Sequence, residues 1–137
     1  MVNQQFATAL HIMTALGSNE GELMASEFLA KSIRANPVLI RTLIMKLSKN
    51  KLVVTVRGKT GGARLGKSPR SISLLDIYRS LAPAPLICTR ETKGDKNCPV
   101  GRCMDGIVQK ISGQIENQIE MYLKNRTLAE VIAEVSE

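Results

Sequence analysis

The 137-residue sequence predicts a mainly α-helical protein with one small β-hairpin. Two observations predict this fold class. Apolar residues recur at helical spacing over most of the chain, whereas the stretch from Lys51 to Gly66 is rich in β-branched residues and glycines. Apolar residues make up 44% of the chain, which is enough for a packed core at this length.

The N-terminal part predicts three short helices. The first covers residues 3–16, and the second covers about 24–34. A break at Ala35-Asn36 precedes the third, for which Asn36 is a good N-cap and Pro37 suits the first helical position. The residues expected on the inner faces of these helices are Phe6, Leu10, Met13 and Leu16, then Phe28, Leu29 and Ile33, then Ile40, Leu43, Ile44 and Leu47.

A hairpin and a fourth helix are expected next. Residues 51–56 predict a strand, Arg57–Gly62 a glycine-rich turn and residues 63–66 a short return strand. A helix over about 73–82 follows, and Pro83 ends this part of the chain. This helix is expected to bury Leu74, Leu75, Ile77, Tyr78 and Leu81.

The C-terminal part predicts a polar loop over residues 83–103 and a long helix over 104–125. Thr127 and Glu130 have the spacing of a capping box and predict a short last helix. The long helix carries a narrow apolar stripe, which is typical of a helix that pairs with a second copy. The alternative is that the stripe packs back on its own domain. The stripe comprises Met104, Ile107, Val108, Ile111, Ile115, Ile119 and Tyr122.

Charge is segregated along the chain, whose net charge is +7. Between Phe28 and Leu75 there are eleven basic residues and no acidic one, whereas residues 104–137 hold six acids and three bases. A basic block of this kind fits a polyanionic partner, although a solvated basic surface is the alternative. Aromatic residues are scarce, which disfavours proteins that bind single-stranded nucleic acid by stacking.

A helix, a short break, a capped second helix and a hairpin form the pattern of a winged helix-turn-helix, here over residues 1–82. A helix fits the major groove of double-stranded DNA, and a slim basic wing can lie against the backbone or in the minor groove. The alternative is a structural or protein-interaction module without operator specificity. The expected DNA-contacting residues are Val38, Arg41, Thr42, Met45, Lys46 and Lys49 on the outer face of the third helix, and Arg57, Lys59 and Arg64 on the wing.

The segments Asn36–Leu47, Leu52–Gly66 and Ile72–Arg79 resemble the Rrf-two (Rrf2) family of bacterial winged helix-turn-helix transcription regulators. The run from Cys98 to Cys103 resembles its YwnA-like branch, and the resemblance covers essentially the whole chain. It implies a repressor that binds a roughly palindromic operator as a homodimer built on the long helix. By position it also implies that Asn36, Val38, Leu39 and Arg41 read bases and that Arg57 is the wing arginine.

The cysteines leave three alternatives open. Cluster-binding relatives in the family have three cysteines in this loop, so that Cys88, Cys98 and Cys103 are candidate iron–sulfur ligands, although their spacing differs. A redox switch is the second alternative, because Cys98 and Cys103 lie near a helix N-terminus and near cations, with Cys88 as a resolving partner. The third is that they are ordinary small residues. No cofactor is firmly predicted.

An enzyme is not expected. Gly61–Ser68 fits the P-loop pattern, but Pro69 follows it and no helix opens directly afterwards, as phosphate binding requires. His11, the single histidine, is expected on the surface or in packing. No segment of the sequence resembles a signal peptide, and it has no run of about 18 apolar residues, so we expect a cytoplasmic protein without membrane contact.

Overall fold

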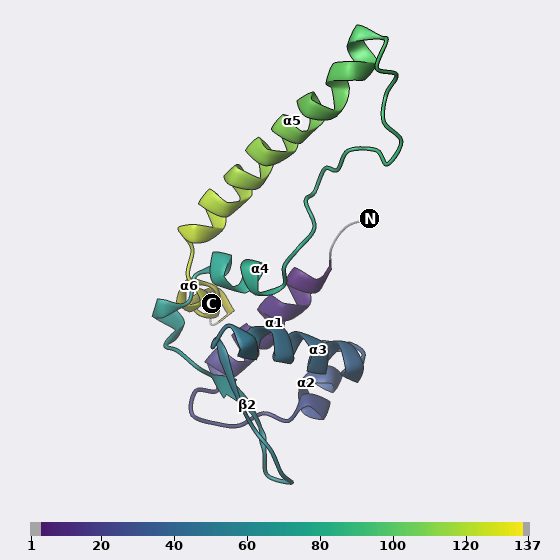
Figure 1. The fold of residues 1–137 in the computed structure, drawn as a ribbon. Coiled ribbons are helices and arrows are strands. Elements are labelled where there is room, and N and C mark those ends of the chain that lie inside the picture. Colours follow the sequence, from purple (N-terminus) through teal and green to yellow (C-terminus); the bar gives the residue numbers. More distant parts are fainter. Residues whose placement is uncertain (1–3, 136–137) are drawn as a thin grey trace. The chain divides into compact units, whose positions relative to one another are not determined.

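The computed structural model describes residues 4–135 and confirms a mainly helical protein with one antiparallel hairpin (Figure 1). Their contacts divide into two units, one formed by residues 4–83 with 123–135 and the other by 84–122. The elements are α1 (Gln5–Ser18), α2 (Ser26–Ile33), α3 (Pro37–Lys49), β1 (Val53–Val56), β2 (Gly62–Leu65), the 3₁₀ helix η1 (Pro69–Ser71), α4 (Leu74–Ser80), α5 (Pro99–Lys124) and α6 (Leu128–Val135). Residue 3, the expected start of the first helix, lies outside the described residues.

The first unit is built around α1, which packs against α2, α3, α4 and α6. Its core contains Ile12, Met13 and Leu16 from α1, all of them buried. The last helix is held to the chain before α4 by two backbone hydrogen bonds, from the Leu74 N–H to the Arg126 oxygen and from the Leu128 N–H to the Ile72 oxygen. The C-terminus of the chain thus completes the N-terminal domain.

Helices α2 and α3 form the expected helix-turn-helix. Arg34 ends α2 in the left-handed conformation (φ 61°), and the Ala35 N–H then donates to the Ala30 oxygen. Asn36 caps α3, because its side-chain oxygen accepts the Val38 N–H at 2.7 Å, and Pro37 is the first helical residue. The predicted inner face is confirmed, since Ile40, Leu43, Ile44 and Leu47 are all buried.

The hairpin is a two-stranded wing anchored to the helical body. Val53 pairs with Leu65 and Val56 with Gly62. Ala63 also exchanges two backbone hydrogen bonds of 2.9 Å with Met24, in the segment before α2. A Cβ on Gly62 would lie 2.6 Å from the Met24 backbone, so the close approach of these two segments requires glycine.

Two capping boxes begin the helices that close the first unit. At α4 the Ser73 hydroxyl accepts the Asp76 N–H and the Asp76 carboxylate accepts the Ser73 N–H, both at 3.0 Å. At α6 the Thr127 N–H donates to the Glu130 carboxylate and the Glu130 N–H donates to the Thr127 hydroxyl, which confirms the box predicted there. Both helix starts are therefore determined by local side chains.

Phe6, Leu10 and Ile33, which were expected on the inner faces, are only half-buried. Three further expectations about these elements were wrong. Phe28 is 58% exposed, whereas Leu29 and Ala30 are the buried residues of α2. Tyr78 is only half-buried and makes an edge contact with the Phe6 ring. The long helix begins at Pro99, five residues before the expected start, so Cys103 lies on the helix and not in the loop.

In the second unit, the segment before α5 is tied to the helix. The Ser112 hydroxyl donates to the Ile87 oxygen at 2.6 Å, and the Leu86 N–H donates to the Glu116 carboxylate at 2.8 Å. The start of α5 is also closely packed, because a Cβ on Gly101 would lie 2.7 Å from the Asp95 oxygen. Most of the apolar side chains of α5 are nevertheless exposed. Among the described residues of this helix, Leu123 alone is buried.

Candidate nucleic-acid interface

Unpaired positive charge covers the helix-turn-helix and the wing. The cations between Phe28 and Leu75 are all exposed except Lys46, and within residues 4–135 none of them forms an ion pair. Lys46 is half-buried, and its Nζ lies 3.5 Å from the Gln5 Oε1. Cations without protein partners remain available to phosphates. They are Lys31, Arg34, Arg41, Lys49, Lys51, Arg57, Lys59, Arg64, Lys67 and Arg70.

The outer face of α3 presents both apolar and polar side chains to solvent. Val38 is 62% and Met45 is 59% exposed, and Arg41 is exposed between them. Apolar side chains of this size at the surface of a helix that is anchored by its opposite face suit contacts with thymine methyl groups. Thr42 and Lys49 are also exposed on this helix, whereas Leu39 is half-buried.

Two of the predicted contact residues have a structural role within α3. The Asn36 side-chain oxygen accepts the Val38 N–H, and the side-chain NH2 group, a double donor, stays available to DNA. The Thr42 hydroxyl donates to the Val38 oxygen at 2.9 Å and keeps its acceptor capacity. Asn36 therefore caps α3, and Thr42 bonds to the backbone of the preceding turn, in addition to any contact with a base.

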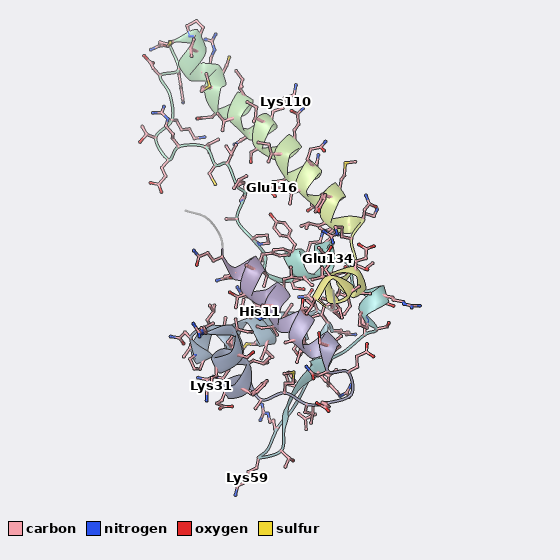
Figure 2. The ribbon with its side chains drawn as sticks, turned by 180° about the vertical axis from the view of Figure 1, so that it is seen from behind. His11, Lys31, Lys59, Lys110, Glu116 and Glu134 are labelled. Carbon is pink, nitrogen blue, oxygen red and sulfur yellow. The ribbon has the colours of Figure 1, made fainter. Side chains whose placement is uncertain are left out.

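The wing carries its cations at and near the tip. Arg57 and Lys59 are exposed on either side of Gly58, whose φ of 112° is a conformation that favours glycine. Figure 2 shows Lys59 at the end of the hairpin, pointing away from the helices. Arg64 lies on β2, opposite Val54, and is also exposed.

A groove of about 580 Å³ separates the wing from the helix-turn-helix. Arg41 lines it from α3, and Arg57 and Lys59 line it from the wing. The start of α2 contributes Ser26 and Glu27, which the sequence analysis did not select. Glu27 immediately precedes the acid-free block in the sequence, and only the fold places it in the same groove as Arg41.

The P-loop-like segment does not form a phosphate-binding loop. Gly62–Leu65 is a strand of the wing, and Ser68 caps a 3₁₀ helix of three residues, because its hydroxyl accepts the Arg70 N–H. A P-loop requires a longer helix that opens directly after the loop and directs several N–H groups at the phosphates. His11 is exposed on α1.

The three cysteines do not lie together in the structure. Cys98 is the residue before α5, and its carbonyl oxygen accepts the Arg102 N–H; Cys103 lies in the second turn. Cys88 follows Ile87, whose backbone oxygen accepts a hydrogen bond from Ser112. At a rise of 1.5 Å per residue, Ser112 lies about 13 Å further along α5 than Cys103. All three thiols are exposed.

This arrangement does not fit a cluster or metal ion held by one protomer. Within residues 4–135, no three His, Cys, Asp or Glu side chains lie close enough together to bind a metal ion. The same separation gives Cys88 no direct contact with the other two cysteines, so that the structure does not support its expected role as their resolving partner within a protomer. None of the helices in the described part of the chain is long and apolar enough to cross a bilayer.

Comparisons with known proteins agree with this geometry. A family model described as "Rrf2: Iron-dependent Transcriptional regulator" matches residues 2–134. The Bacillus subtilis protein named "Putative HTH-type transcriptional regulator YwnA" is 30% identical over 132 residues, which covers 96% of this chain and 97% of YwnA.

Solved structures show the same architecture. A "putative transcriptional regulator" from Lactobacillus plantarum is similar with a TM-score of 0.84 at 25% identity, over 98% of this chain and 91% of that one. IscR from T. potens has a TM-score of 0.71 at 24% identity, over 98% and 88% of the two chains. CymR, the global cysteine regulator of B. subtilis, has a TM-score of 0.69 at 21% identity, over 98% and 97% of the two chains. These last two likenesses show the fold. The helix-turn-helix, the basic wing and the family match together show that the chain belongs to the Rrf2 family and is a DNA-binding transcriptional regulator, not an enzyme.

Proposed function

We propose that the chain is a repressor that binds a roughly palindromic operator as a homodimer, with α3 in the major groove and the wing against the flanking backbone or minor groove. The observation that carries this proposal is the set of exposed, unpaired cations on α3 and the wing. A surface that needed only solubility would mix charges of both signs, whereas the block from Phe28 to Leu75 has no acid to pair with them.

The proposed contacts divide by chemistry. The first half of α3 carries the base-reading groups, Asn36, Val38, Leu39 and Arg41, and Thr42 and Met45 continue the same face. The remaining contacts hold the phosphates, because long cations at the sides of the helix and on the wing give affinity and register without sequence information. They are Lys46, Lys49, Arg57, Lys59 and Arg64.

The homodimer is proposed from the exposed apolar face of α5. Met104 is 42%, Ile107 48% and Ile111 46% exposed, although they lie on one stripe of a 26-residue helix. Pairing with the same stripe of a second copy would remove these side chains from water. Such a dimer carries two copies of α3, and paired recognition helices read half-sites about one turn of DNA apart. A two-fold dimer of this kind requires an operator with matching two-fold symmetry.

The test is to select duplexes from a random pool with the purified protein and to measure binding to the selected duplex and to a scrambled one at several salt concentrations. We expect a palindromic consensus, a stoichiometry of two chains per duplex and an affinity that falls steeply with salt. The proposal is overturned if the protein binds the selected and scrambled duplexes equally tightly.

Arg41→Ala is expected to weaken binding to the selected duplex by about 1–3 kcal/mol and to relax the preference at one or two base pairs, because an arginine on the outer face of α3 can bind a guanine edge through two hydrogen bonds. The matched control is Arg57→Ala on the wing, which removes the same charge. It should weaken binding to both duplexes and lower the salt dependence by about one unit. If Arg41→Ala also weakened both duplexes equally, Arg41 would be a phosphate contact.

For the signal, we propose that Cys98 and Cys103 are redox thiols. Peroxide would oxidise the pair to a disulfide, with the two electrons and two protons converting the peroxide to two water molecules. Cys98 directly precedes α5 and Cys103 lies in its second turn. At helical spacing, Cα atoms five residues apart are separated by roughly 8–9 Å, beyond the reach of a disulfide, so oxidation has to unwind the first turn of α5. We expect peroxide to alter operator affinity in the wild type and to leave it unchanged in Cys98→Ser; equal affinity of oxidised and reduced wild type would exclude the switch.

A further inference from the structure

Glu27 places a carboxylate in the groove that we assign to DNA. It lies in the first turn of α2 and is exposed, and it lines the same groove as Arg41, Arg57 and Lys59. In the described part of the chain it has no cationic partner; the hydroxyl of Ser26 lies 3.5 Å from its Oε2. An acidic side chain thus interrupts an otherwise basic surface.

The position of Glu27 at the start of α2 explains only in part why a carboxylate lies in this groove. A carboxylate in the first turn interacts favourably with the helix dipole, and the N-cap residue Ala25 offers no side-chain cap of its own. That interaction stabilises the helix and predicts no effect on DNA binding. In the groove, however, the same carboxylate repels phosphates, so it lowers the affinity for DNA of any sequence unless the complex supplies a hydrogen-bond donor.

We propose that Glu27 positions the Arg41 guanidinium for a base edge and thereby determines specificity. A guanidinium has five N–H donors, of which a guanine edge takes two, so the others can donate to a carboxylate in the same groove. On operator DNA, Arg41 is held between the base and Glu27, and the carboxylate is compensated. On other DNA, Arg41 turns to phosphates and Glu27 is left to repel the backbone. This inference rests on the proposed placement of α3 and the wing on DNA.

The experiment is a double-mutant cycle with Glu27→Gln, Arg41→Ala and the double variant, measured on the selected and scrambled duplexes. Glu27→Gln should strengthen binding to the scrambled duplex and lower the ratio of the two affinities by about fivefold or more, out of the roughly 5- to 150-fold that one bidentate contact supplies. In the Arg41→Ala background, Glu27→Gln should leave the ratio unchanged.

Glu22→Gln is the matched control. Glu22 is exposed on the same domain but lines a separate hollow between α1 and α2. The Glu22→Gln variant should raise the affinity for both duplexes slightly and equally, because it changes only the net charge. Thermal unfolding of each variant checks that the fold is retained.

The outcomes separate the two proposals. An unchanged affinity ratio in Glu27→Gln overturns this inference while leaving the DNA interface intact. A ratio that still falls in the Arg41→Ala background shows that Glu27 acts without Arg41, which also overturns it. A wild-type protein that does not distinguish the two duplexes overturns the proposed function itself.

Discussion

Ile111→Asp is expected to dissociate the proposed homodimer into monomers and to abolish tight operator binding. Ile111 lies near the middle of α5 and is 46% exposed. In an interface with two-fold symmetry, each substitution is present twice, and a carboxylate buried there without a partner is destabilising by about 3–5 kcal/mol. We therefore expect the dimer dissociation constant to rise by at least two orders of magnitude.

Analytical ultracentrifugation over a range of protein concentrations measures this change, and a binding titration with the selected duplex measures its consequence. The matched control is Asn117→Asp, which adds the same charge to an exposed position about 120° around the helix from Ile111. The control should remain dimeric. A variant Ile111→Asp that sediments as the wild type does would place the dimer interface elsewhere on the molecule.

Local signals in the sequence predicted the domain that carries the site. Asn36 and Pro37 define the start of α3 by chemistry that acts within one turn, and Thr127 and Glu130 do the same for α6. The inner stripe of α3 also follows directly from helical spacing. These predictions succeeded because each depends on residues no more than four positions apart.

Features that depend on contacts between distant segments could not be predicted from the sequence. Phe28 and Leu29 are both apolar, and only the packing of α2 on α1 and α3 decides which of them is buried. The first turn of α5 contains Gly101, and glycine is a poor helix former. It is required there because a Cβ would lie too close to the Asp95 backbone, which only the fold reveals. Pro99 was an available signal for this helix start, since proline favours the first helical position. The placement of Glu27 and Arg41 in one groove likewise depends on the fold.

Leu43→Ala is expected to destabilise the protein by about 2–5 kcal/mol while leaving its sequence preference unchanged. Leu43 is fully buried on the inner face of α3, a helix that packs against α1 and α4. Truncation leaves a cavity in a domain whose total stability is on the order of 5–15 kcal/mol, so a large share of that stability is lost. Denaturant unfolding of the wild type and the variant measures the difference.

Arg41→Ala is the matched counterpart, because Arg41 and Leu43 lie two residues apart on opposite faces of the same helix. The first variant should change base preference with little effect on stability, and the second should change stability with little effect on base preference. This crossed result follows only if α3 is a rigid helix whose two faces have separate tasks. If Leu43→Ala, assayed at a temperature at which it is fully folded, also lost its base preference, the recognition surface would depend on the core packing beneath it.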